Sequence, residues 1–372
     1  MSNNLISIIT PSFNHETYIS RFIESVISQN YQNWELIIVD DCSEDETFQI
    51  AQKYKYKDER IKLYKNEYNA GVNYTINKAF ELSSGQIVTT IASDDELNDN
   101  ALSKINDYFN SHDDIDFTSC NLKVIDENSL PSKAYPNSML PELKEREKHD
   151  ILHDMFFHGN QLYAPGMCFR RKVLEKILPQ SFSSILFQDY ITNIDALIYF
   201  NLGIIKDCLV KYRILNTSLS NLGERSIKLE KVENSSVLDS FLKLSDVWLL
   251  EKIFKNEIID LKIKPNTRNI SFFLGMMAIK SDDTQRQIWG LNKIKEFYNS
   301  NAKMLHDEYG FEFKNLINLC SKISISSPHN KFKKKKKSLF SILMKKTFSL
   351  TKKNDKHMLT ILGMQIICNN KN

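Results

Sequence analysis

Three short polar segments of this 372-residue chain carry side chains that can hold metal ions or phosphates. They are Pro11-Ser12-Phe13-Asn14, Asp40-Asp41 and Ser93-Asp94-Asp95. Paired carboxylates suit Mg²⁺ or Mn²⁺, which prefer oxygen ligands and often bridge to the phosphates of a substrate. Neither a G-x-x-x-x-G-K-[ST] loop nor a G-x-G-x-x-G loop follows the first apolar run. Phosphates bound here would therefore need a carboxylate-held metal to neutralise them.

Alternating apolar runs and helical patterns determine whether these segments meet. A single acid at a strand end could equally cap the following helix. The expected strands are 5–10, which Pro11 stops, 34–39, 61–64 and 86–92. One helix is expected at 18–27, a second after a Ser43 cap with acids in its first turn, and a third at 72–85. This alternation predicts an α/β fold with a mostly parallel sheet and helices on both faces. Ligands of such sheets bind beyond the carboxyl ends of the strands, so the three segments should share one rim.

Five motifs follow one another along the chain: Ser7–Asn14, Trp34–Asp45, Asn69-Ala70-Gly71, Ser84-Gly85 and Ser93-Asp94-Asp95. In this order they resemble the signatures of the family 2 inverting glycosyltransferases. The resemblance covers roughly residues 5–215, and it implies the Rossmann-like GT-A fold and a nucleotide-diphosphate sugar as donor. A UDP-sugar is the usual donor of that family.

The first two motifs correspond to the family's nucleotide site. Pro11, Phe13 and Asn14 belong to the segment that lines the base and ribose. Asp41 corresponds to the carboxylate that accepts a hydrogen bond from the base, and Asp40 lies beside it. The resemblance thus implies substrate binding by all five residues.

The remaining motifs supply the other expected roles. Asn69 and Gly71 correspond to the loop over the nucleotide. Asp94 corresponds to an acid near the ribose or sugar, and Asp95 to the ligand of Mg²⁺ or Mn²⁺. Asp189 lies where the family has its catalytic acid, so the resemblance implies that it is the general base. An exposed acid at a helix N-terminus is the alternative for Asp189.

Two positions depart from the family pattern. Ala92 replaces the Asp that begins the acidic motif in many relatives, and Leu215 replaces the His of a Tyr-Arg-x-His motif that can complete the metal shell. These departures leave an alternative interpretation, in which the chain is a catalytically impaired nucleotide-sugar-binding or scaffold protein. A sugar nucleotidyltransferase would need a Gly- and Arg-rich loop after the first strand, and a processive synthase would need spanning helices and Gln-x-x-Arg-Trp.

The expected activity is therefore transfer of one sugar, as by a hexosyltransferase, to a hydroxyl of a glycan or lipid-linked acceptor. Such a reaction would contribute to synthesis of a cell-surface polysaccharide. The residues give no indication of which sugar is transferred or which acceptor receives it.

Composition and charge predict three regions and a location. They are a GT-A domain at 1–220, a helical appendix at 221–325 and a basic amphipathic tail at 326–372. Residues 322–372 hold 13 lysines and one acid, which leaves 36 basic and 45 acidic residues before them. Widely spaced cysteines and the lack of a signal peptide or an 18-residue apolar run favour a cytoplasmic protein.

The tail has three interpretations. It could be a solvated charge run, a nucleic-acid-binding segment or a contact with the anionic inner face of the cell membrane. No base-stacking module accompanies the lysines, so no nucleic-acid partner is expected. Apolar residues at 339–344 between the lysines favour a peripheral membrane contact over a solvated end.

Overall fold

The computed structural model describes residues 2–133, 140–181, 184–215, 224–323, 348–353, 356–361 and 364–368. The chain forms two compact units, residues 1–323 and 324–372. The division expected near residue 220 lies within the first unit. That unit therefore holds both the sheet and the helical region that follows it.

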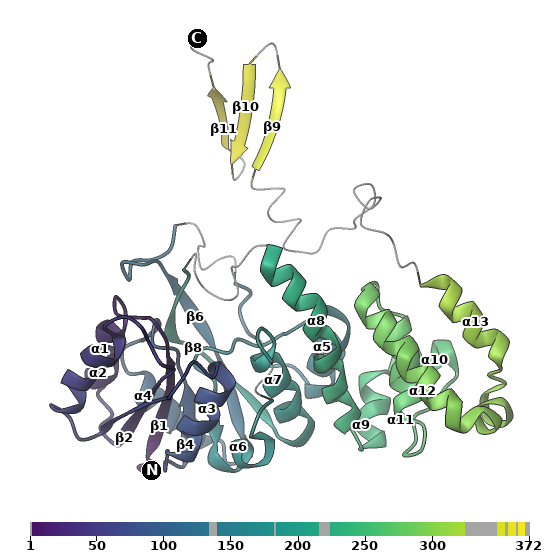
Figure 1. Ribbon diagram of the computed structural model, residues 1–372, viewed down its shortest axis with the longest axis horizontal. Helices are drawn as coiled ribbons and strands as arrows, with labels where there is room; N and C mark the ends of the chain where they lie inside the picture. The colour runs from purple at the N-terminus through teal and green to yellow at the C-terminus, as the bar shows by residue number, and fades with distance from the viewer. Residues whose placement is uncertain are drawn as a thin grey trace. The chain divides into compact units, whose positions relative to one another are not determined.

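An eight-stranded sheet forms the centre of the first unit (Figure 1). Its order is β3-β2-β1-β4-β7-β6-β8-β5. The strands are β1 (Ile6–Ser12), β2 (Trp34–Asp40), β3 (Ile61–Lys65), β4 (Ile87–Thr90), β5 (Glu96–Leu97), β6 (Phe117–Ile125), β7 (Cys168–Arg170) and β8 (Leu202–Arg213). Strands β3, β2, β1 and β4 run parallel, as do β6 and β8, while β7 and β5 are antiparallel to their neighbours. The parallel half places the carboxyl ends of β1, β2 and β4 on one rim.

Helices cover both faces because alternate residues of the central strands point to opposite sides. Ile8 and Ile38 belong to one apolar cluster, and Ile9 and Ile37 to the other. The first cluster includes residues of α1 (Ile19–Ile27), α2 (Thr47–Lys55) and α4 (Ala101–Ser111). The second includes residues of α3 (Val72–Glu81), α5 (Lys148–His158), α6 (Arg171–Ile177) and α7 (Gln188–Tyr199). The predicted α/β fold with helices on both faces is confirmed.

The helical region expected after residue 220 shares the second apolar cluster with the sheet. Phe156 of α5 packs edge-on against Phe241 and Phe254, with ring centroids 5.0 and 4.9 Å apart. The elements are α8 (Glu224–Ser240), η3 (Phe241–Lys243), α9 (Val247–Ile253), α10 (Lys255–Leu261), α11 (Ile270–Ile279), α12 (Thr284–Tyr309) and α13 (Phe313–Lys322). In Figure 1, α5, α7 and α8 lie between the sheet and helices α9–α12. Burial of these aromatic side chains makes the two regions one packed body.

The second unit contains a three-stranded antiparallel sheet that the sequence patterns did not predict. Its order is β11-β10-β9, with β9 (Phe348–Lys353), β10 (Lys356–Ile361) and β11 (Met364–Cys368). The lysine run at 333–337 and the apolar residues at 339–344 lie outside the described residues. Within the described ranges, no helix combines the length and the apolar character needed to cross a membrane.

Two local predictions were wrong. Strand β1 continues through Pro11 to Ser12, whereas Pro11 was expected to stop it. The β1–β4 pairing ends at Ile9 while the β1–β2 pairing continues, so the missing N–H of Pro11 faces no β4 partner in that ladder. Ser43 does not cap α2, which begins at Thr47, because the Ser43 side chain donates to Asp40 instead.

Candidate functional site

Hydrogen bonds join the ends of β1, β2 and β4 into one rim. The Ser93 hydroxyl donates to the Ser12 hydroxyl at 2.9 Å, and His15 Nδ1 lies 2.8 Å from the same Ser93 oxygen. The backbone N–H of Asp41 donates to the Ser12 carbonyl at 2.8 Å. The structure therefore brings the three polar segments together, as the strand order predicts.

The two carboxylates after β2 bind different parts of the chain. Asp40 is fully buried and accepts hydrogen bonds from the backbone N–H and the hydroxyl of Ser43. Asp41 accepts from the backbone N–H groups of Ala70 and Gly71 at 2.9 and 2.8 Å and from Asn66 Nδ2 at 2.8 Å. Asp41 therefore determines the path of the 69–71 loop, a role that the sequence did not suggest.

The 69–71 loop turns sharply where it meets α3. Gly71 has a φ of +90°, a backbone conformation that side-chain-bearing residues rarely adopt. Its N–H points to Asp41 while its carbonyl accepts the N–H of Thr75 in the first turn of α3. Asn69 is exposed beside this turn. A glycine at this position lets one carboxylate bind two successive N–H groups.

The β1 loop presents one aromatic side chain to solvent. Phe13 is 38% exposed, whereas Pro11 is partly buried at the β1–β2 pairing. Asn14 has a φ of 53°, and its side-chain oxygen accepts the N–H of Glu44 at 2.9 Å. The Phe13 ring is thus available to a flat ligand, while Asn14 holds the β1 and β2 loops together.

Strand β8 fixes the acidic segment through Arg213. The Arg213 N–H donates to Asp95 Oδ1 at 2.8 Å, and its Nε donates to the Asp94 carbonyl at 2.7 Å. Asp95 is buried, whereas the Asp94 side chain is 15% exposed and lies 3.9 Å from His15 Nε2. Burial and the adjacent Asp94 charge raise the pKa of Asp95 well above its usual range.

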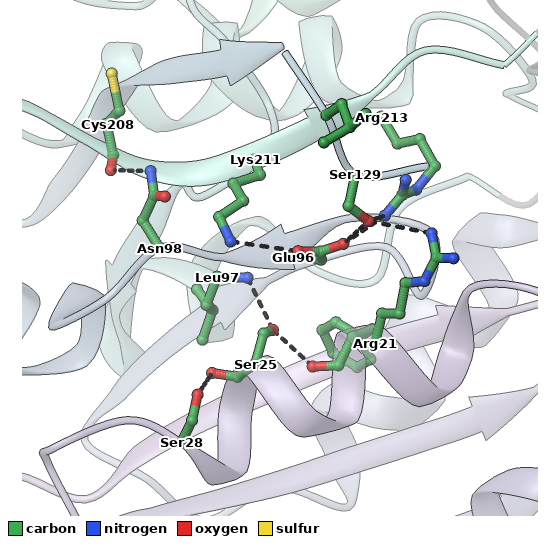
Figure 2. Close-up of polar contacts among 12 residues, drawn as sticks. Arg21, Ser25, Ser28, Glu96, Leu97, Asn98, Ser129, Cys208, Lys211 and Arg213 are labelled. Carbon is green, nitrogen blue, oxygen red and sulfur yellow. Dashed lines mark hydrogen bonds and ion pairs between the residues drawn. The ribbon is translucent and has the colours of Figure 1, made fainter. Parts of the chain in front are cut away.

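The Arg213 guanidinium itself lies in a closed polar cluster (Figure 2). Its side chain is 0% exposed and pairs with Glu96 Oε1 at 2.6 Å, while Nη2 also donates to the Ser129 hydroxyl at 2.9 Å. Nη1 donates to the Asp126 carbonyl at 2.5 Å. Lys211 approaches the other Glu96 oxygen at 3.3 Å. These contacts tie the acidic segment to β5, β8 and the turn after β6.

The Asp94–Asp95 pair suits Mg²⁺ or Mn²⁺ in its chemistry. Two adjacent carboxylates, one of them buried, repel each other, and a bound divalent cation would relieve that repulsion. The described residues contain no cluster of three or more His, Cys, Asp or Glu side chains arranged to hold a metal. Leu215, two residues after β8, has no ligand atom in its side chain. The site therefore fits a metal held by one or two carboxylates, with phosphate and water as its other ligands.

Asp189 lies in the first turn of α7. Helix α7 packs on the same face of the sheet as α3. Asn160 Nδ2 donates to its Oδ2 at 3.0 Å, and Asn160 Oδ1 in turn accepts from Asn193 Nδ2 at 3.1 Å. Burial raises the pKa of Asp189 to about 6, against the opposing effect of its hydrogen bonds. This carboxyl group can therefore exchange a proton near neutral pH.

Helix α3 connects the Asp189 region to the 69–71 loop. Asn73, two residues after Gly71, donates to the carbonyls of Ser181 and Ser184 at 2.7 and 3.1 Å. The Asn77 side chain also donates to the Gln180 carbonyl and accepts the Gln180 backbone N–H, both at 3.2 Å. The segment that leads into α7 is thus attached to the helix that begins at the 69–71 loop.

Sequence reasoning missed several residues that shape this site. Arg213 was visible as part of the Tyr-Arg-x-His-like segment but received no role, and Glu96 directly follows the acidic pair. His15 and Asn160 gave no signal, because nothing in their local sequence indicates contacts with Ser93 or Asp189.

These features define an α/β protein whose polar site lies beyond the carboxyl ends of parallel strands. Residues 7–178 match the family model described as Glycosyl transferase family 2. Over these residues, just under half of the chain, the protein is therefore similar to the family 2 glycosyltransferases, which have the GT-A fold.

Two curated relatives and one crystal structure show the range of the similarity. The putative teichuronic acid biosynthesis glycosyltransferase TuaG of Bacillus subtilis is 44% identical over 100 residues, 27% of this chain and 40% of TuaG. The Escherichia coli UDP-Glc:alpha-D-GlcNAc-diphosphoundecaprenol beta-1,3-glucosyltransferase WfgD is 38% identical over 134 residues, 36% of this chain and 51% of WfgD. The matches thus span about half or less of these relatives. The structure of S. aureus TarS 1-349 in complex with UDP-GlcNAc has a TM-score of 0.51 at 16% identity, with 99% of each chain covered, a likeness of fold.

Replacing Arg213 by Met should lower the free energy of unfolding by about 3 kcal/mol, because the change leaves Glu96 with a single cationic partner in a buried cluster. Urea unfolding followed by circular dichroism measures this loss. The control is Lys104→Met, which removes the same charge from an ion pair with Asp207 whose side chains are 40% and 54% exposed. That control should cost less than about 1 kcal/mol, and equal losses in the two variants would contradict the role of the Arg213 cluster.

Proposed function

We propose that this chain is an inverting glycosyltransferase that moves a sugar from a nucleotide-diphosphate donor to a hydroxyl of a glycan or lipid-linked acceptor. The observation that carries this proposal is a separation of carboxylates into two environments. Asp94 and Asp95 form an adjacent pair at the strand rim, while Asp189 stands apart on α7 with its pKa raised to about 6. One environment suits a leaving diphosphate and the other suits an attacking hydroxyl.

The nucleotide of the donor would bind against the loops after β1, β2 and β3. Phe13 offers an exposed ring, and Pro11, Asn14 and Asp40 belong to the framework that supports it. Asp41 already accepts three hydrogen bonds, and a carboxylate has about four acceptor positions, so it can still accept one from a base. Asn69 and Gly71 would then cover the nucleotide.

A UDP-sugar is the proposed donor. Support comes from the WfgD relative, whose name specifies UDP-Glc, and from the family resemblance. Asp95, with Asp94 near the ribose or sugar, would hold Mg²⁺ or Mn²⁺. Such an ion supplies positive charge that offsets the charge developing on the leaving diphosphate.

Asp189 would act as the general base. It accepts the proton of the acceptor hydroxyl as the hydroxyl oxygen attacks the anomeric carbon and the bond from that carbon to the diphosphate oxygen breaks. Attack from the face opposite the diphosphate inverts the anomeric configuration. Asn160 keeps Oδ2 of Asp189 in place through its 3.0 Å hydrogen bond.

The acceptor would approach from the side of Asn160. Gln161 and Leu162 line a cavity of about 160 Å³ together with Lys144 and other residues of the 141–151 segment. The WfgD relative is named for a diphosphoundecaprenol-linked acceptor. We therefore propose a glycan carried on a lipid diphosphate, used in synthesis of a cell-surface polysaccharide.

A panel of nucleotide sugars, assayed with Mg²⁺ or Mn²⁺ for thermal shift and for release of nucleoside diphosphate, tests the donor and the base together. A UDP-sugar should stabilise the protein and turn over, and Asp189→Asn should reduce kcat about 10²- to 10⁴-fold while UDP still binds. Asp95→Asn should instead weaken the metal-dependent binding of UDP. Full turnover by Asp189→Asn would reject the assigned base. Binding without turnover by the wild type would favour the catalytically impaired binding protein.

The pH profile gives a separate test of Asp189. A base must be ionised, so kcat/KM should fall about tenfold per pH unit below a pKa near 6, whereas an ordinary Asp would remain ionised down to about pH 4. The hydrogen bond from Asn160 favours the ionised form, so Asn160→Ala should move this acidic limb to higher pH. Measurement of kcat/KM from pH 4.5 to 8.5 tests whether Asp189 is the general base. A profile that stays flat down to pH 5 would contradict that role.

We further propose that the basic tail at 326–372 brings a cytoplasmic enzyme to the anionic inner face of the cell membrane. The 12 lysines of residues 326–372 would be attracted to anionic lipids that surround a lipid-linked acceptor. Cell fractionation of the chain with and without residues 331–372 tests this idea. Loss of the membrane-bound fraction on truncation is expected, and unchanged recovery in the soluble fraction would reject the contact.

A further inference from the structure

A carboxylate of the helical region binds the backbone just ahead of Asp189. Glu233 of α8 is only 6% exposed. Its Oε1 accepts the N–H of Ile185 at 2.5 Å, and its Oε2 accepts the N–H groups of Leu186 and Phe187 at 2.8 and 3.1 Å. Three successive N–H groups therefore converge on one buried side chain.

This arrangement satisfies two electrostatic needs at once. A buried carboxylate is costly unless hydrogen bonds replace its water, and charge-assisted bonds from N–H groups do so well. The segment that enters α7 also needs acceptors for its N–H groups, and the N-cap residue Phe187 makes no side-chain capping bond. The negative charge of Glu233 lies at the positive end of the α7 dipole. Both the helix start and the carboxylate thus depend on the same contact.

The contact acts on the backbone two residues before Asp189. A catalytic group must be held within about 0.5 Å of its working position, and a displacement of about 1 Å can cost 10²-fold in rate. Phe187 is the N-cap residue of the helix that carries Asp189, so a shift of residues 185–187 would move Asp189 away from Asn160. An ion pair between Lys243 and Asp195, 2.6 Å long, holds α7 further along its length.

We propose that Glu233 is a positioning residue for the transfer reaction, holding residues 185–187 so that Asp189 meets the acceptor hydroxyl. This inference rests on the proposed role of Asp189 as general base. It assigns a part in the reaction to a helix that lies beyond the residues matched by the family model, which end at 178.

The primary test is Glu233→Gln in the full chain, assayed by release of UDP from the UDP-sugar that the panel above identifies. The amide keeps the size of the side chain but removes the charge and turns an NH₂ group toward an N–H donor. We expect kcat to fall about 10- to 100-fold, with the donor KM and the affinity for UDP unchanged within twofold. Glu233→Asp keeps the charge and should recover part of the loss.

The matched control is Asp239→Asn, the same carboxylate-to-amide change on the same helix. Asp239 is 50% exposed and pairs with Trp289 and Lys293 of α12 rather than with the α7 segment. This variant should keep kcat within twofold of the wild type. An equal loss of kcat in Asp239→Asn and Glu233→Gln would show a general effect on α8 packing and overturn the proposal.

A double variant separates this inference from the assignment of Asp189. If Glu233 acts through Asp189, adding Glu233→Gln to Asp189→Asn should cost nothing further in the residual rate. Full activity of Asp189→Asn would reject the base itself. An inactive Asp189→Asn beside an unaltered Glu233→Gln would reject only the positioning role. Should Glu233→Gln fail to fold, as judged by circular dichroism, Glu233→Asp must show the split between kcat and KM, and a wild-type kcat in that variant would overturn the proposal.

Discussion

The site depends on buried carboxylates that are held by backbone N–H groups. Asp41 accepts from Ala70 and Gly71, Asp95 accepts from Arg213, and Glu233 accepts from residues 185–187. A carboxylate taken from water loses several kcal/mol unless donors replace the solvent, and a buried loop loses as much when its N–H groups lack acceptors. Each charge therefore determines a loop conformation, and each loop in turn keeps its charge in place.

This mutual dependence separates residues that build the site from residues available to a ligand. Asp40 is buried and accepts hydrogen bonds from Ser43, with Lys65 Nζ 3.8 Å from its Oδ2. Phe13 and Asn69 are instead exposed beside these loops. Asp189 belongs to neither group. Burial of its carboxyl group raises its pKa to about 6, while the hydrogen bond from Asn160 opposes that rise. A group that accepts and releases a proton needs that intermediate environment.

The helical region belongs to the same packed body as the sheet. The apolar cluster on one face of the sheet continues into α8, α9, α11 and α12, and polar contacts reinforce it. Arg286 of α12 donates to the carbonyls of Met155 and Phe156, and the Tyr190 hydroxyl donates to the same Met155 carbonyl. Helix α7, which carries Asp189, is therefore supported from the sheet side and from the helical side.

The sequence alone determined the α/β alternation, the helical region and the convergence of three polar segments, because periodicity and residue type act over a few neighbouring positions. It also indicated which side chains had suitable chemistry, including Asp41, Asp95 and Asp189. Only the tertiary structure decided what these side chains touch. Arg213 meets Asp95 across 118 positions and Glu233 meets Ile185 across 48, and no local pattern specifies such partners. Burial in the folded chain, rather than residue type, sets the pKa of Asp189, since the desolvation that raises it exists only once α7 is packed.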